Sequence, residues 1–417
     1  MITRPYLALV SVLCLAVFSS PAVFAAKKTS LKLPEEKALE DKEEVADDWL
    51  EIQVSGQQYI VGWSRLKLYR AKSEKHGGKV FLVLRKAKMI NPKTGFIRRL
   101  VERSLWDSHG RLIRMRTSRR SGDESKRLEV TWNEGHVVIQ SLSKSGKSPI
   151  KLPCADRPSC EEDALMYIHP LDVGQEREVA MVDLENMKIG QGSIKNEGSQ
   201  MYEITVKGER TDVELWRVTS TAHAAPVEFY FDLDGQLVES RVSGTPVLTL
   251  RTDNSPKLLN QMVYGNPLIL SLRLPKLRAA WKKKGATYAN KDLGLQIPVP
   301  AGWRREVESE KGTQLFVCSH PDNAARLLVA LEVVGDAWEL DEYTKAAAGR
   351  GDVDKTSKAK FAGQDAIRVH FKEEGASLWK YVVIRKGYAY QFVFLAYPDK
   401  KAMAAAKKLA RSVRFSE

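Results

Sequence analysis

Hydrophobic and polar residues alternate in a series of short runs between Trp49 and about residue 254. A period of two is typical of a β-strand with one buried and one solvent-facing side. The runs cover residues 50–54, 63–69, 80–84, 99–106, 112–116, 128–132, 137–142, 178–184, 201–206, 213–218, 226–231 and 237–242. Short turns rich in Gly and Asn separate many of them, which favours antiparallel pairing of neighbours. We therefore predict an all-β antiparallel domain, a meander or half-barrel, over residues 49–254.

The pattern changes after residue 287, where helical periods occur among the strands. Strand-like runs lie at 288–290, 293–299, 313–318, 326–334, 358–361, 365–371, 378–386 and 388–396. Apolar residues recur at helical spacing over 339–348 and again over 400–412, where Pro398-Asp399 is a typical start signal. Residues 287–417 are therefore predicted to form an α+β domain that follows the all-β domain.

A basic segment, residues 255–286, separates the two patterns. Its side chains from 273 to 284 include arginines and lysines but no acid. A helix here would place Leu274, Leu277 and Trp281 on one side, as in an amphipathic helix that lies on an anionic membrane surface or on a partner. The candidate contacts are Lys282, Lys283 and Lys284. The alternative is an interdomain helix whose lysines are only solvated.

The N-terminal 25 residues have the pattern of a secretory signal peptide. Arg4 precedes an apolar run over 7–18, and Val23-Phe24-Ala25 supplies the small residues of a cleavage site near Ala25. Residues 26–48 are rich in Glu, Asp and Lys and poor in large apolar side chains, which predicts a flexible acidic leader. We therefore expect an extracytoplasmic protein, periplasmic or secreted.

The composition is that of a globular protein, with 43% hydrophobic and 28% charged residues and a formal net charge of +14. A basic exported protein is attracted to an anionic membrane surface, an envelope polymer or another envelope protein. The expected compartment argues against nucleic acid and nucleotide as partners. The alternative is that the positive charge only keeps the surface soluble.

Cysteines in an oxidising compartment can form disulfides. Cys154 and Cys160 lie close together in the proline-rich segment Pro-Cys-Ala-Asp-Arg-Pro-Ser-Cys. This spacing predicts a local disulfide across a loop. Cys318 lies in a strand-like run and is predicted to be a buried, inert thiol.

Arginines accumulate between residues 98 and 127. Arg114, Arg116 and Arg120 have the same parity, so a strand would place them on one face. Because the guanidinium fork suits carboxylate and phosphate, these three are candidate anion- or partner-binding residues. The alternative is an outer face that charge keeps soluble.

Catalytic motifs are absent from the sequence, which has neither a Gly-x-Ser-x-Gly elbow nor a His-Glu-x-x-His pair. Cys154 or Cys160 with His169 would suffice for nucleophilic catalysis, but a disulfide would abolish that activity. We therefore expect no catalytic residues, no metal site and no cofactor.

Four segments of the C-terminal part form a set: 288–290, 293–303 (Leu-Gly-Leu-Gln-Ile-Pro-Val-Pro-Ala-Gly-Trp), 361–366 (Phe-Ala-Gly-Gln-Asp-Ala) and 412–415 (Ser-Val-Arg-Phe). Together they resemble the PsbP-like family of α/β/α sandwiches. The resemblance implies such a sandwich over residues 287–417. It also implies an accessory or interaction role, and it supplies no catalytic residues.

Two segments of the first domain, 56–63 (Gly-Gln-Gln-Tyr-Ile-Val-Gly-Trp) and 231–237 (Phe-Asp-Leu-Asp-Gly-Gln-Leu), form its expected first and last strand pairs. They resemble the β domain that precedes transglutaminase-like domains in some bacterial exported proteins, and such sheets are similar to LolA-type carrier half-barrels. After residue 260 no Cys, His and Asp follow in a suitable order, so the resemblance implies no enzymatic activity.

The combined prediction is an exported, non-enzymatic binding or envelope accessory protein. An alternative is a carrier or sensor of a lipidic or hydrophobic ligand, held in a concave face of the β domain. A third interpretation is an enzyme of unrecognised type, which would need Cys, His and acidic side chains in one cleft. A cavity between the apolar faces of the meander would favour the carrier.

Overall fold

A computed structural model describes residues 31–416 except 55–59, 92–94, 122–123, 143–147, 207–208, 224, 323, 336, 349–352, 372–375 and 398. The chain divides into two compact units. The first unit extends to Ser255 without residues 93–95, and the second contains Pro256 onward together with 93–95. The expected signal peptide lies outside the described residues. In the described part, no helix is both long and apolar enough to cross a membrane.

Among the described residues of the first unit, fourteen antiparallel strands form one sheet. Strands that follow each other in the chain are paired, except for the edge strands β8 and β9, and β1 (Glu40–Val54) also pairs with β14 (Val247–Arg251). The other strands are β2 (Gly62–Ser73), β3 (Gly78–Ile90), β4 (Ile97–Asp107), β5 (Leu112–Ser121), β6 (Glu124–Asn133), β7 (His136–Ser141), β8 (Ile150–Pro153), β9 (Glu176–Asp183), β10 (Lys188–Val206), β11 (Glu209–Ser220), β12 (Val227–Phe231) and β13 (Leu237–Val242). The predicted antiparallel meander is confirmed.

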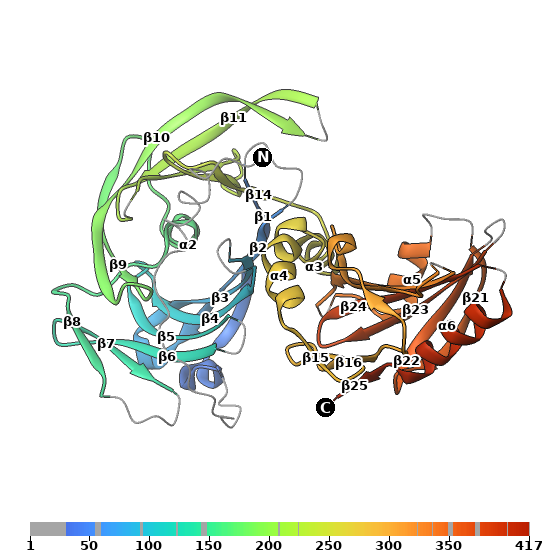
Figure 1. Ribbon diagram of the computed structural model, residues 1–417. Helices are drawn as coiled ribbons and strands as arrows, with labels where there is room; N and C mark the ends of the chain where they lie inside the picture. The colour runs from blue at the N-terminus through green and yellow to red at the C-terminus, as the bar shows by residue number, and fades with distance from the viewer. Residues whose placement is uncertain are drawn as a thin grey trace. The chain divides into compact units, whose positions relative to one another are not determined.

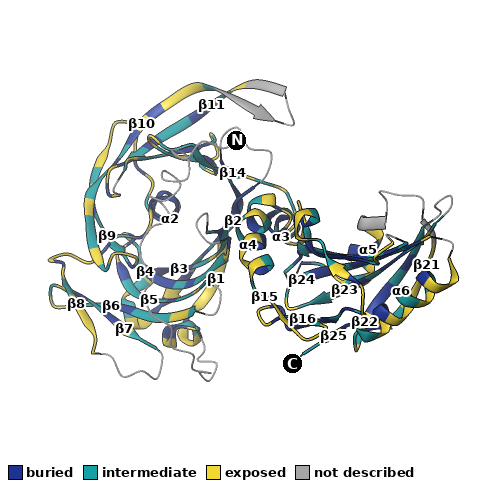
Figure 2. Ribbon diagram, viewed as in Figure 1, coloured by how far each residue is buried: buried dark blue, intermediate teal, exposed yellow. Residues whose placement is uncertain are grey.

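The sheet curves around a short helix, α2 (Glu162–Ile168), as Figure 1 shows. Seven residues are too few for a stable isolated helix, so α2 depends on its packing against the sheet. Leu165 and Ile168 pack in one apolar cluster with Phe81 and Val83 of β3. In Figure 2, α2 is largely buried. We call the face of the sheet that packs against α2 the inner face.

The loop that precedes α2 links the edge strand β9 to β5. Ser159 N donates to Ala180 O of β9 at 2.7 Å, and Leu112 N of β5 donates to Pro158 O at 2.8 Å. Gly110, with φ of 71°, lies against α2, where a Cβ atom would come within 2.5 Å of Leu165 Cδ1. The close approach of this turn to α2 therefore requires glycine.

The prediction of a flexible acidic leader is wrong for residues 33–48. A 3₁₀ helix, η1 (Pro34–Ala38), is followed by β1, which begins at Glu40. Leu33 and Leu39 are buried in an apolar cluster with Leu82 and Leu105, on the opposite face of the sheet from α2. The acidic side chains of β1 pair with basic side chains of β2, for example Glu44 with Lys67. These long-range contacts order a segment whose local composition favours disorder.

The second unit is an α+β domain, as predicted. Two sheets are present among its described residues. The smaller has the order β15 (Trp281–Lys284), β16 (Thr287–Asn290), β17 (Leu295–Pro298) and β25 (Arg414–Phe415). The larger has the order β18 (Arg304–Arg305), β19 (Gln314–Ser319), β20 (Ala325–Val333), β24 (Tyr388–Ala396), β23 (Ser377–Arg385), β22 (Gln364–Phe371) and β21 (Val353–Phe361). A 3₁₀ helix, η3 (Val307–Ser309), lies between β18 and β19, and another, η2 (Glu74–His76), belongs to the first unit.

Helices cover both faces of the larger sheet. Tyr343 of α5 (Leu340–Ala348) packs with Val382 of β23. Leu409 of α6 (Lys400–Ser412) belongs to a second cluster that contains Val383. Since adjacent residues of a strand point to opposite faces, α5 and α6 lie on opposite sides of the sheet.

The basic segment 255–286 is helical only in part, and the amphipathic helix considered for it does not extend to Trp281. Residues 256–264 form α3 (Pro256–Tyr264), and residues 267–279 form α4 (Pro267–Ala279). Trp281 and Lys282–Lys284 belong to β15, which pairs with β16. The three lysines are exposed on this edge strand. Lysines are common on edge strands because they discourage pairing with other chains. Lys282–Lys284 fit this role, and they do not lie on a helix.

Candidate ligand pocket

A pocket of about 700 Å³ lies inside the curl of the first unit. One wall is formed by the inner face of β2 to β6. The facing wall includes the end of β9, the start of β10 and residues 159–161 and 222–223. Pockets that bind small organic ligands typically measure roughly 300–1,000 Å³, so this pocket is large enough for one such ligand.

The register of the strands arranges the first wall in rows. One row runs across β2 to β6 through Ser64, Ala87, Leu100, Arg119 and Lys126. Each of these residues lines the pocket. Because residues two apart share a face, the row lies on the side that carries Phe81 and Val83.

The apolar part of the lining comes from both walls. Trp106 and Met115 line the pocket from β4 and β5, and Met181, Leu184 and Ile189 line it from the facing side. Methionine side chains are flexible and polarisable, so they adapt to irregular apolar ligands. The pocket therefore has an apolar surface next to its charged side chains.

Arg85 is the centre of the buried charged group. Its guanidinium donates two hydrogen bonds to Asp163 of α2, at 2.9 and 2.7 Å, and forms an ion pair with Glu161 at 2.9 Å. The Arg85 and Asp163 side chains are only 12% and 8% exposed. This paired, two-point contact ties α2 to the inner face of β3.

Glu102 lies directly opposite Arg85 in the β3–β4 register and is 5% exposed. Burial penalises the ionised form, and nearby Glu161 adds repulsion, so the pKa of Glu102 is raised to about 7. The Glu102 carboxyl group therefore changes charge near neutral pH, inside the first unit.

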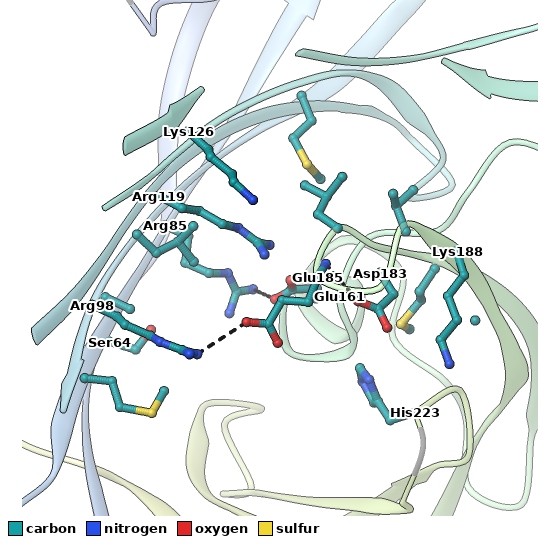
Figure 3. Close-up of a pocket in the computed structure, with 18 of the residues that line it drawn as sticks. Ser64, Arg85, Arg98, Arg119, Lys126, Glu161, Asp183, Glu185, Lys188 and His223 are labelled. Carbon is teal, nitrogen blue, oxygen red and sulfur yellow. Dashed lines mark hydrogen bonds and ion pairs between the residues drawn. The ribbon is translucent and has the colours of Figure 1, made fainter. Parts of the chain in front are cut away.

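Further basic groups line the pocket in Figure 3, where Arg98, Arg119 and Lys126 extend from one wall toward Glu185 and Asp183 on the other. Arg98 Nη1 lies 3.5 Å from Glu185 Oε1, longer than the contacts of Arg85. The pocket therefore has a basic wall and a facing acidic wall.

His223 lines the pocket, and its Nε2 lies 2.7 Å from Glu162 Oε1. The hydrogen bond to Glu162 raises the pKa of His223. Ser220 Oγ donates to the same carboxylate oxygen at 2.5 Å. Because the serine hydroxyl bonds to the carboxylate and not to the imidazole, these residues do not form the nucleophile–base arrangement of a hydrolase.

The predicted arginine site is not brought together as a binding face. Arg114 pairs with Glu35 at 3.1 Å, and both Arg114 and Arg116 contact Glu129, at 3.2 and 2.7 Å. Their charges are thus compensated within the fold. Arg120 alone of the three lines the pocket.

The predicted disulfide is not formed, because Cys154 and Cys160 are free, buried thiols. Their backbones are held by different neighbours: Cys154 N donates to Gly135 O, and Cys160 N donates to Gly110 O. Burial raises the pKa of the Cys160 thiol, which makes it a poor nucleophile. Cys318 is buried, as predicted, and burial raises the pKa of its thiol to about 12, which makes it unreactive.

The sequence analysis did not propose Arg85, Arg98 or Arg119 as binding residues, although all three line the pocket. Arg98 and Arg119 lie in the arginine-rich stretch. One available signal was parity: Arg119 shares parity with Met115, an apolar residue of the same strand. Arg85 follows the alternation of Phe81 and Val83. Arginines in phase with apolar residues point toward the core side, which is where a lined cavity forms.

No family model and no curated protein matches this chain. Among solved structures, a β-barrel-like protein of Brucella abortus with a domain of unknown function is 8% identical, covering 51% of this chain and 94% of its own, with a TM-score of 0.30. Cyanobacterial PsbP (CyanoP) from Synechocystis sp. PCC 6803 is 13% identical, covering 32% and 97%, with a TM-score of 0.26. MucB in the MucA/MucB complex of Pseudomonas aeruginosa is 10% identical, covering 90% and 94%, with a TM-score of 0.16. These values indicate only a loose likeness of fold and carry no functional argument.

Proposed function

We propose that this protein is an exported, non-enzymatic binding protein whose first unit carries a small amphiphilic ligand. The observation that supports this proposal is the pocket of about 700 Å³ inside the curled sheet. A meander that served only as a scaffold would fill this space with side chains. The apolar lining suits a hydrocarbon or ring system, and the charged wall suits a polar head.

The non-enzymatic part of the proposal rests on the chemistry of the lining. Ser220 is bonded to Glu162 and not to His223. His169, the expected partner of a cysteine, instead contacts Arg177 at 2.9 Å. The described residues contain no group of three or more His, Cys, Asp or Glu placed to hold a metal ion. Binding is therefore the activity that the lining supports best.

The direct test is to identify what the purified protein retains. Full-length protein made in an exporting bacterial host is extracted with organic solvent, and the extract is analysed by mass spectrometry. We expect an amphiphile in stoichiometric amount. Binding of N-phenyl-1-naphthylamine, a neutral dye that fluoresces in apolar surroundings, provides a second readout on the stripped protein.

Filling the pocket should abolish that binding. Ala87 lies in the pocket row between Ser64 and Leu100, so Ala87→Trp places an indole inside the cavity. We expect dye affinity to fall at least about tenfold, since the ligand loses its space. Lys86→Trp is the matched control, because Lys86 is exposed and its neighbours in the strand face inward.

Two results would remove the carrier proposal. One is a clean extract together with no dye binding by the wild-type protein. The other is equal dye binding by Ala87→Trp and Lys86→Trp. Circular dichroism and thermal unfolding of both variants establish that each is folded.

A further inference from the structure

We propose that Arg119 and Lys126, with Arg98 beside them, form an oxyanion subsite that binds the head group of the ligand. The ligand would then be an anionic amphiphile, with a phosphate or carboxylate head and an apolar body. This inference rests on the proposed function and narrows it to one class of ligand.

The first observation is an unfavourable pairing of like charges. Arg119 of β5 and Lys126 of β6 are direct cross-strand partners, and both line the pocket. Directly opposed residues of an antiparallel pair have Cβ atoms roughly 4.5–5.5 Å apart, and like charges at this distance destabilise the sheet. An anion bound beside this pair would be attracted to both side chains.

The second observation is that Arg119 lacks the compensation that other arginines of the first unit have. Arg85 is paired with Asp163 and Glu161, and Arg114 and Arg116 are paired with Glu129. Among the described residues, no carboxylate lies within ion-pair distance of Arg119.

Glu102 is the acid to which Arg119 is electrostatically coupled, and burial holds much of Glu102 in its neutral form at pH 7. The positive charge of Arg119 is therefore only partly offset within the fold. An arginine guanidinium is suited to two-point contact with an oxyanion.

Arg98 extends the subsite along β4. Its neighbour in the β4–β5 register is Ser121, two residues from Arg119, so both guanidinium groups belong to the same side of the wall. Its contact with Glu185 at 3.5 Å is long and weak enough to be exchanged for a ligand oxyanion. Figure 3 shows Arg98, Arg119 and Lys126 extending in the same direction into the pocket.

The apolar body of the ligand has a surface next to these cations. Leu100 is the direct neighbour of Arg119 on β4, and Met181 and Leu184 line the facing wall. A head group at Arg119 thus leaves the tail against Leu100 and toward Met181. A pocket with a cationic end and an apolar end should bind an anionic amphiphile more tightly than a neutral lipid or a free anion.

The test compares ligands of equal tail on the full-length protein. Dodecyl phosphate, dodecanoate and dodecanol compete for bound N-phenyl-1-naphthylamine, and inorganic phosphate alone is titrated by calorimetry. We expect the anionic ligands to displace the dye at about 10- to 100-fold lower concentration than dodecanol, the range expected for charged hydrogen bonds. The double substitution Arg119→Gln and Lys126→Gln should erase this preference while dye affinity stays within about twofold.

Lys86→Gln removes one positive charge from the same sheet outside the pocket and should keep the preference. A second readout separates binding from architecture: at about pH 6, Arg119→Gln should raise Tm by about 1–3 °C because it relieves the repulsion with Lys126. A purely structural arginine would lower Tm on removal.

The outcomes separate this inference from the proposed function. If dye binds but dodecanol competes as well as dodecyl phosphate, or if the double variant keeps the preference, the oxyanion subsite is refuted and the carrier proposal stands. If inorganic phosphate binds as tightly as dodecyl phosphate, the site is one for a free anion and the amphiphile assignment is overturned. If the wild-type protein binds no dye, the proposed function itself fails.

Discussion

Replacing Arg85 with methionine should destabilise the first unit by about 3–5 kcal/mol, the usual cost of breaking a buried ion pair. Arg85→Met leaves Asp163, 8% exposed, without its cation, and it also removes the positive charge opposite buried Glu102. Because the pair joins β3 to α2, the loss should be largest at α2. Urea denaturation followed by hydrogen exchange of peptides that contain residues 162–168 measures this local effect.

A double variant provides the control. Arg85→Met combined with Asp163→Leu removes both charges and replaces them with apolar groups of similar size, so it should cost much less than Arg85→Met alone. If Arg85→Met shifts α2 stability by less than about 1 kcal/mol, the ion pair does not hold the helix, and apolar packing must hold α2 in place.

Raising the pH from about 5 to about 8 should destabilise the first unit, and Glu102→Gln should remove most of this dependence. The pKa of Glu102 in the folded protein, about 7, lies above its ordinary value of 4.5. The stability contributed by the neutral carboxyl is therefore fully present below about pH 4.5 and is lost as the pH rises through about 7. The size of the loss is on the order of 3 kcal/mol.

His223 acts in the same direction, because its hydrogen bond to Glu162 raises its pKa in the folded protein. The difference between wild type and Glu102→Gln isolates the contribution of Glu102. Glu178→Gln changes the same type of side chain at an exposed position of β9 and should follow the wild-type curve. Equal pH slopes for wild type and Glu102→Gln, measured by thermal unfolding across this range, would contradict the assignment.

Local patterns predicted the strands well because alternation is set by the geometry of the chain itself. Each residue of a strand points opposite to its neighbour, whatever it later packs against. The runs at 80–84 and 112–116 are found within β3 and β5 for this reason. The terminal helix over 400–412 was also predicted from the sequence, because Asp399 is a typical N-cap residue. In the structure its side chain accepts a hydrogen bond from Ala402 N at 2.8 Å.

The pocket was harder to predict from the sequence, because its position depends on which face of the sheet is concave. Arg114 and Arg116 share a face as expected, but that face is covered by η1 and its glutamates. A bulge between Leu112 and Arg114 also shifts the alternation, so that Leu112 and Met115, of opposite parity, both enter the core. Parity therefore grouped Arg114 and Arg116 correctly but did not indicate which face encloses the pocket.

What the sequence alone determined is the succession of strands and helices and the change from an all-β to an α+β part, because these follow from periodicity over neighbouring residues. Only the tertiary structure decided that Lys282–Lys284 form an edge strand, that the thiols of Cys154 and Cys160 are free, and that Arg119 and Lys126 lie side by side on a pocket wall. Local periodicity specifies neither the register between two strands nor the face of the sheet that becomes concave. The pocket lined by β2 to β6 and by β9 and β10 exists only once strand pairing has curved the sheet.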